Sequence, residues 1–159
     1  NQGHLDKVMS FIESGLSSGA TLLLDGRRQL PSETGLHEGY DMGPCIFDEV
    51  DPQTKIAQEE IFGPVLSVFS FDDEDEAIAL ANNTSFGLAA YASTTNLVRA
   101  QRLGEAINSG TLTVYGSSQL SGNWVAIASE KHRDSGLGFS GGKEGLYQYS
   151  TSTAVHLLT

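Results

Sequence analysis

Apolar and polar residues alternate along this chain with two different periods, one typical of helices and one typical of strands. Between Leu5 and Leu16 the apolar positions recur every three or four residues, and Gly19 follows where a left-handed C-terminal cap would lie. The same helical spacing begins after Asp73 and again after Asn96, and both residue types cap helix N-termini. The pattern therefore predicts three main helices.

Short apolar runs separate these helices and predict strands. Their length, their β-branched residues and the turn residues at their ends favour strands over helices. The expected strands are Thr21–Leu24, Cys45–Phe47, Val65–Phe71, Phe86–Ala92 and Leu112–Val114. Because strands and helices alternate, we expect an α/β fold with a mainly parallel sheet flanked by helices.

Two parts of the chain carry little periodic pattern. Residues 27–43 mix Pro, Ser, Gly and His, which predicts an exposed excursion. A loop-rich segment follows Tyr115, and a short helix is expected near Gly142–Tyr149. The last apolar run, Thr151–Leu158, predicts a strand that would be free to pair with another subunit.

Length and charge exclude several classes of function. A chain of 159 residues fits one compact domain. Its net charge of −11 opposes binding to nucleic acid or to an anionic membrane surface, and its apolar runs are far shorter than the roughly 20 residues of a membrane-spanning helix. The single cysteine cannot form an internal disulfide, so we expect a cytoplasmic protein. A start at Asn1, beside helical patterning and without a leader, suggests a longer parent chain.

Several short motifs are better explained by structure than by chemistry. Gly136–Gly141 has the letters of a dinucleotide fingerprint, but it follows a polar segment and no acidic residue lies about 20 positions further on, so it predicts a turn. The acidic run Asp72–Glu76 suits a helix N-terminus, and the four histidines are too scattered to predict a metal site. Cys45 lies in an expected strand without a nearby histidine, so we interpret it as a buried small hydrophobe.

The stretch Ile56–Phe69 joins an acidic pair, a Gly-Pro turn and an apolar strand. A carboxylate fixed at the end of a short strand can accept both hydroxyl protons of a ribose, while an adjacent aromatic covers a planar ring. This stretch closely resembles the cofactor-side motif of the aldehyde dehydrogenase superfamily. The resemblance assigns Glu60 to the nicotinamide ribose, Phe62 to the nicotinamide ring, and Leu88 to the nicotinamide side of the pocket. The alternatives are an exposed loop carboxylate for Glu60 and ordinary core packing for Phe62 and Leu88.

The resemblance covers almost the whole chain. Its further motifs, in the order of the family, are Leu5–Val8, Gly43–Val50, Ala81–Ala90, Ser135–Gly138, Glu144–Leu146 and Tyr149. Enzymes of this family oxidise a small aldehyde to a carboxylic acid with NAD or NADP, through a cysteine thiolate and a thioester that a glutamate-activated water hydrolyses. That cysteine and that glutamate lie upstream of the motifs matched here.

The resemblance therefore implies a C-terminal portion of such an enzyme, without catalytic residues or metal and inactive alone. Residues 1–149 would belong to the catalytic domain, and residues 150–159 would form an oligomerisation strand of a homodimer or homotetramer.

Three positions depart from the pattern of the family. Ala128–Lys131 stands where the family has Pro-Phe-Gly-Gly, Phe139–Ser140 replaces Arg-Glu, and Tyr115 replaces an asparagine. These positions help to wall the substrate tunnel in the family. They motivate an alternative interpretation, a non-catalytic scaffold or interaction domain that keeps the fold.

Overall fold

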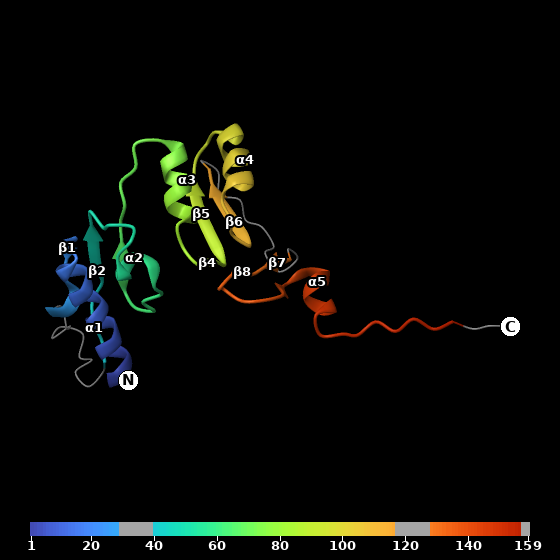
Figure 1. The fold of residues 1–159 in the computed structure, drawn as a ribbon, viewed down its shortest axis with the longest axis horizontal. Coiled ribbons are helices and arrows are strands. Elements are labelled where there is room, and N and C mark those ends of the chain that lie inside the picture. The colour runs from blue at the N-terminus through green and yellow to red at the C-terminus, as the bar shows by residue number, and fades with distance from the viewer. Residues whose placement is uncertain (29–39, 117–127, 157–159) are drawn as a thin grey trace. The chain divides into compact units, whose positions relative to one another are not determined.

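Two separate sets of strands organise the chain, one in residues 1–83 and one in residues 84–159. The computed structural model describes residues 1–28, 40–116 and 128–156 (Figure 1). The length predicted one compact domain, but the described chain divides into two compact units.

The first unit contains three strands and three α-helices. In chain order its elements are α1 (Gln2–Ser17), β1 (Thr21–Leu24), a 3-10 turn (Gly26–Arg28), β2 (Cys45–Asp48), α2 (Lys55–Gln58), β3 (Val65–Ser67) and α3 (Glu74–Asn82). The strands form one sheet in the order β1-β2-β3, in which β1 is antiparallel and β3 parallel to β2. The short helix α2 was not predicted, because four residues are too few to show a helical period.

Helix α1 forms as its sequence pattern predicts. The Asn1 side chain caps its first turn by accepting a hydrogen bond from the His4 N–H, and Gly19 follows its end with a φ of +88°. The apolar face of α1 packs closely on β2 and α2: a Cβ atom at Gly15 would lie 2.9 Å from the side chains of Phe47 and Ile56. The sequence therefore places a residue without a side chain at this close contact.

Among the described residues, the buried apolar core lies in this first unit. Its members are apolar side chains from α1, β2, α2 and the segments that connect the elements: Val8, Phe11, Ile12, Ala20, Cys45, Phe47, Val50, Ile56 and Ile61. Strand β3 is shorter than the predicted Val65–Phe71. Its pairing with β2 extends only as far as Ser67, although β2 itself continues to Asp48.

The second unit is built from short strand pairs. Its elements are β4 (Phe86–Gly87), β5 (Ala89–Ser93), α4 (Leu97–Ala106), β6 (Thr111–Tyr115), β7 (Ser129–Glu130), β8 (His132–Arg133), β9 (Phe139–Ser140) and α5 (Gly142–Tyr147). Strands β5 and β6 are parallel and joined through α4, whereas β4 pairs with β8 and β7 with β9 antiparallel. The helices and the parallel pairs of the two units confirm the predicted α/β class.

The caps and turns of the second unit follow the sequence closely. The Asn96 side chain accepts hydrogen bonds from the N–H groups of Val98 and Arg99, which confirms it as the N-cap of α4. Gly136, Gly138 and Gly141 all have positive φ angles, but the fingerprint-like string is only partly the predicted turn, because Phe139–Ser140 within it form β9.

The expected strand Phe86–Ala92 is broken at Leu88. The residues before Leu88 pair with β8 and those after it pair with β6, so the chain changes partner at this point. At the other end of the unit, Thr151–His156 is exposed and in no helix or strand, and the rest of the expected terminal strand lies outside the described residues. A strand exists only where it pairs, and within the described chain this segment has no pairing partner.

The described part of the second unit lacks a buried apolar core. Of its described residues only Gly87 is buried, and large apolar side chains of α4, including Leu97 and Val98, are exposed. Parallel strand pairs are ordinarily covered on both faces. This part of the chain therefore leaves apolar surface uncovered. Within the described residues no helix combines the length and the apolar character needed to cross a membrane.

We predict that Gly63→Ala destabilises the first unit. A Cβ atom at this position would lie 2.7 Å from a methyl group of Val8, whose side chain is buried and branched and so cannot turn away. Overpacking of this kind lowers the free energy of unfolding by about 1–3 kcal/mol. Urea denaturation followed by circular dichroism measures the change.

The matched control is Gly104→Ala in α4. Nothing lies within 4 Å of a Cβ atom at Gly104, so this substitution is expected to leave stability unchanged or to raise it by about 0.5–1 kcal/mol. Adding Val8→Ala to Gly63→Ala should relieve part of the steric conflict. The double variant should therefore lose less free energy of unfolding than the sum of the two single losses. Equal stability of Gly63→Ala and the unmodified chain would contradict the packing described.

Candidate functional site

The segment between α2 and β3 carries Glu60 and Phe62. Helix α2 ends at Gln58, and Glu59 already has an extended backbone, with φ −108° and ψ 148°. Ile61 then points into the core, with only 8% of its surface exposed. Glu60 and Phe62, the neighbours of Ile61 on either side, are both exposed on the surface.

Phe62 combines two unusual properties. Its φ is +58°, in the left-handed region, and 70% of its surface is exposed. This backbone conformation costs a non-glycine residue about 1–2 kcal/mol. An exposed aromatic ring recovers little of that cost by burial, so the conformation is not explained by core packing. Strained residues of this kind concentrate at ligand-binding and active sites, which supports a functional interpretation.

The neighbours of Phe62 hold the strained conformation in place. The Phe62 carbonyl oxygen accepts a hydrogen bond of 2.8 Å from Nε2 of His4 in the first turn of α1. Gly63 packs directly against Val8, one helical turn further along α1. The segment is thus attached to α1 on one side and to the core through Ile61 on the other.

The Glu60 carboxylate is available for a ligand. It is exposed, and among the residues that the structure describes no side chain or backbone group hydrogen-bonds to it. An ionised carboxylate offers two acceptor oxygens, which match two neighbouring hydroxyl groups. Exposure alone is common for a glutamate. What distinguishes Glu60 is its place two residues before an exposed, conformationally strained aromatic.

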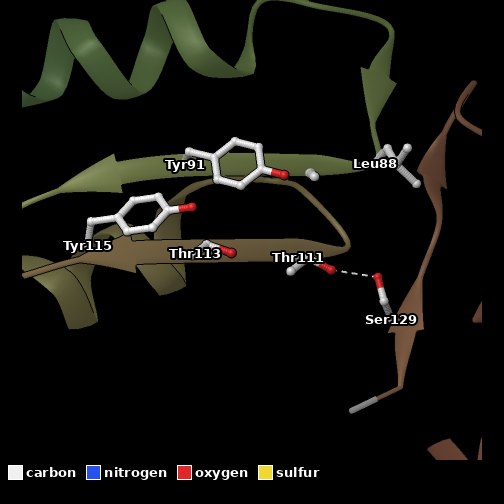
Figure 2. Close-up of a pocket in the computed structure, with 7 residues that line it drawn as sticks. Leu88, Tyr91, Thr111, Thr113, Tyr115 and Ser129 are labelled. Carbon is white, nitrogen blue, oxygen red and sulfur yellow. Dashed lines mark hydrogen bonds between the residues drawn. The ribbon is translucent and has the colours of Figure 1, made fainter. Parts of the chain in front are cut away.

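Leu88 belongs to the second unit, at the point where the chain passes from β4 to β5. With 54% of its surface exposed it is not a core residue, so ordinary core packing does not describe it. Leu88 lines a surface pocket of about 490 Å³. Figure 2 shows this pocket, whose lining residues are Leu88, Ala89, Tyr91, Thr111, Thr113, Tyr115 and Ser129.

The pocket lies on one face of the β5–β6 pair. Tyr91 is in register with Thr113, and the rings of Tyr91 and Tyr115 stack with their centroids 6.3 Å apart. The hydroxyl groups of Thr111 and Ser129 are 2.6 Å apart and hydrogen-bonded (Figure 2). The pocket is therefore lined by two tyrosine rings and by threonine and serine hydroxyl groups.

Sequence reasoning identified Leu88 but not the rest of this pocket. Alternation along β6 puts Thr111, Thr113 and Tyr115 on the same face, a period-two signal that is visible in the sequence. Tyr115 was noted only as a departure from the family pattern. His4 was missed for a different reason: it lies 58 residues from Phe62, and nothing local in either motif indicates the contact.

Cys45 is buried, as the sequence predicted. Only 1% of its surface is exposed, and its Sγ atom accepts a hydrogen bond from the Gly26 N–H at 3.3 Å. A thiol in this position is inaccessible to a substrate. Asp73, in the acidic run, caps α3 by accepting a hydrogen bond from the Glu76 N–H, and the described ranges contain no group of three or more potential metal ligands.

The comparisons with known proteins agree on one family. The Aldehyde dehydrogenase family matches residues 1–155. Betaine aldehyde dehydrogenase of Brucella anthropi is 40% identical over 157 residues, which are 99% of this chain and 31% of that protein. The 4-trimethylaminobutyraldehyde dehydrogenase of Oryzias latipes is 36% identical over 154 residues, which are 96% of this chain and 30% of that protein. The chain thus spans less than a third of the length of these curated relatives.

Solved structures give the same result. Betaine aldehyde dehydrogenase from Staphylococcus aureus in complex with NAD+ superposes with a TM-score of 0.83 at 32% identity, over 94% of this chain and 29% of that one. Mycobacterium tuberculosis aldehyde dehydrogenase complexed with NAD+ gives 0.82 at 31% identity, with the same coverage of the two chains. By sequence and by fold, this chain belongs to the aldehyde dehydrogenase family.

Proposed function

We propose that this chain is the C-terminal part of an NAD(P)-dependent aldehyde dehydrogenase and that it supplies one side of the cofactor site. The observation that carries the proposal is the Glu60–Phe62 segment. It presents a carboxylate that has no partner among the described residues, and an exposed ring, on a strained backbone that is held by α1 and by the core. Family membership is the second support, and the NAD+ bound in two of the similar solved structures is the third.

In this proposal Glu60 and Phe62 position the nicotinamide end of the cofactor. The two carboxylate oxygens of Glu60 would accept hydrogen bonds from the hydroxyl groups of the nicotinamide ribose, and the ring of Phe62 would cover the nicotinamide. The cofactor, when bound, supplies the acceptor for the hydride that leaves the substrate. The contribution of this chain is orientation, which accelerates hydride transfer by keeping donor and acceptor close and aligned.

Leu88 is proposed to line the nicotinamide side of the site. Its exposure supports this role, because a side chain that the described chain leaves uncovered is available to a ligand or to another part of the parent protein. The curated relatives named above carry the names of different aldehydes. The proposal for the substrate is accordingly limited to a small aldehyde, which is oxidised to a carboxylic acid.

The catalytic cysteine and the glutamate that activates water are proposed to lie in another part of the parent polypeptide. Cys45 is buried, and the second unit presents apolar surface that further polypeptide would cover. Residues 1–149 would then belong to the catalytic domain. Residues 150–159 would form a strand that pairs with another subunit of a cytoplasmic homo-oligomer, and the exposed, unpaired backbone of Thr151–His156 supports that role.

The purified 159-residue chain is expected to show no aldehyde-dependent NADH production. It offers no accessible thiol for attack on an aldehyde, since its single cysteine is buried. The assay follows absorbance at the NADH wavelength with several aldehydes, with an active aldehyde dehydrogenase as positive control. Turnover at ordinary enzyme rates would refute the assignment of the nucleophile to another part of the protein.

In the complete parent enzyme, Glu60→Gln is expected to weaken NAD+ binding and to slow hydride transfer by about tenfold each. The amide replaces a charged acceptor by a neutral one, and hydrogen bonds to a charged group are stronger by about 1–2 kcal/mol. Stopped-flow measurement of NADH formation and a cofactor titration give the two values.

Glu59→Gln is the matched control for this experiment. Glu59 is the exposed carboxylate next in the chain, but its backbone caps α2 and its side chain has no role in the proposal, so both values should stay within about twofold of the unmodified enzyme. Indistinguishable behaviour of Glu60→Gln and Glu59→Gln would remove Glu60 from the site. A folded parent protein without any turnover would favour the scaffold interpretation instead.

A further inference from the structure

The hydrogen bond between His4 and Phe62 joins two segments that no motif connects. Nε2 of His4 lies 2.8 Å from the Phe62 carbonyl oxygen, although the residues are 58 positions apart. We propose that His4 is a positioning residue, which holds Phe62 in its left-handed conformation so that Glu60 and Phe62 face the cofactor together. This inference rests on the cofactor site of the proposed function and adds a residue to it.

Helix α1, which carries His4, is held in place by its contacts with the core. Val8 and Ile12, on the same face of α1 at successive turns, are buried in the core, so the helix cannot shift without opening that core. Val8 is also the residue against which Gly63 packs. Helix α1 therefore contacts two consecutive residues of the segment, the Phe62 carbonyl through His4 and Gly63 through Val8.

The strain at Phe62 explains why this hydrogen bond matters. The side chain of Phe62 is exposed, so its own packing does little to hold the backbone at a positive φ. The constraint comes from both sides: Ile61 is buried before it and Gly63 is packed after it, and His4 fixes the peptide group between them. Loss of the His4 hydrogen bond would release the Phe62–Gly63 peptide group, one of the two peptide groups whose orientation sets the direction of the Phe62 side chain.

The chemistry of the contact determines what can replace histidine. A carbonyl oxygen only accepts hydrogen bonds, so His4 must carry a proton on Nε2. Glutamine places an amide N–H donor the same number of bonds from the backbone. Leucine has a similar size but no donor. His4→Gln is therefore expected to keep the contact, and His4→Leu is expected to lose it.

The test uses the complete parent enzyme with His4→Leu, His4→Gln, Glu60→Gln and the double variant of His4→Leu with Glu60→Gln. For His4→Leu we expect a Kd for NAD+ about fivefold higher, the equivalent of one ordinary hydrogen bond, with the KM for the aldehyde unchanged. His4→Gln should restore the Kd to within about twofold of the unmodified enzyme. Hydrogen exchange in peptides covering residues 59–64 should be faster in His4→Leu and normal in His4→Gln.

A matched control removes another donor from the same helical turn. The Gln2 side chain donates to Asp6 within α1 and does not touch the segment. Gln2→Leu should therefore change neither cofactor affinity nor hydrogen exchange in residues 59–64. If it has the same effect as His4→Leu, the loss comes from the stability of the helix end, and the positioning role is refuted.

The double variant separates this inference from the proposed function. If His4 acts through the segment, the loss of NAD+ affinity in the double variant should be smaller than the sum of the losses in His4→Leu and Glu60→Gln, a non-additive result. Normal affinity and exchange in His4→Leu, with weakened binding in Glu60→Gln, would refute the role of His4 and leave the cofactor site intact. Normal affinity in Glu60→Gln would refute the proposed function, and hydrogen exchange would still decide whether His4 holds the backbone.

Discussion

The packing of α1 on the three-stranded sheet is the constraint on which the rest of the first unit depends. Phe11 and Ile12 of α1 and Phe47 of β2 are almost completely buried, and Gly15 lets helix and sheet approach more closely than any larger residue would allow. This packing fixes the helix rigidly. Residues that contact the exposed end of α1, in particular the segment before β3, are therefore held in place as well.

The candidate site depends on this rigidity. Glu60 and Phe62 are exposed, and exposed side chains are ordinarily free to move. Here the residue between them is buried and the residue after them is packed against Val8, so the backbone that carries them is held from within. A surface site built on core contacts can present its groups in a fixed direction before a ligand arrives, which reduces the entropy lost on binding.

Local patterns in the sequence predicted the elements that are stabilised locally. The Asn96 cap and the Gly19 helix end depend on the chemistry of a few adjacent residues, and the structure confirms them. Patterns failed where a distant partner decides the outcome. Strand β3 extends only as far as its pairing with β2, and the break at Leu88 is set by a change of pairing partner.

In the candidate site, too, the sequence predicted some features, and contacts between distant residues decide the others. A family resemblance identified Glu60, Phe62 and Leu88, and the exposure of all three is compatible with ligand contact. The positive φ of Phe62 could not be predicted from its own residue type, because phenylalanine rarely adopts it. The contact with His4 required the fold itself, since only the docking of α1 brings the two residues together.

The glycine turn that leads into α5 has a consequence for how such sequences are annotated. Gly136, Gly138, Gly141 and Gly142 all adopt positive φ angles, and a Cβ atom at Gly138 would also collide with the side-chain oxygen of Gln148. Backbone geometry alone therefore dictates a glycine-rich string at these positions. A pattern search that treats spaced glycines as a phosphate-binding signature would select this turn for a steric reason that has nothing to do with phosphate.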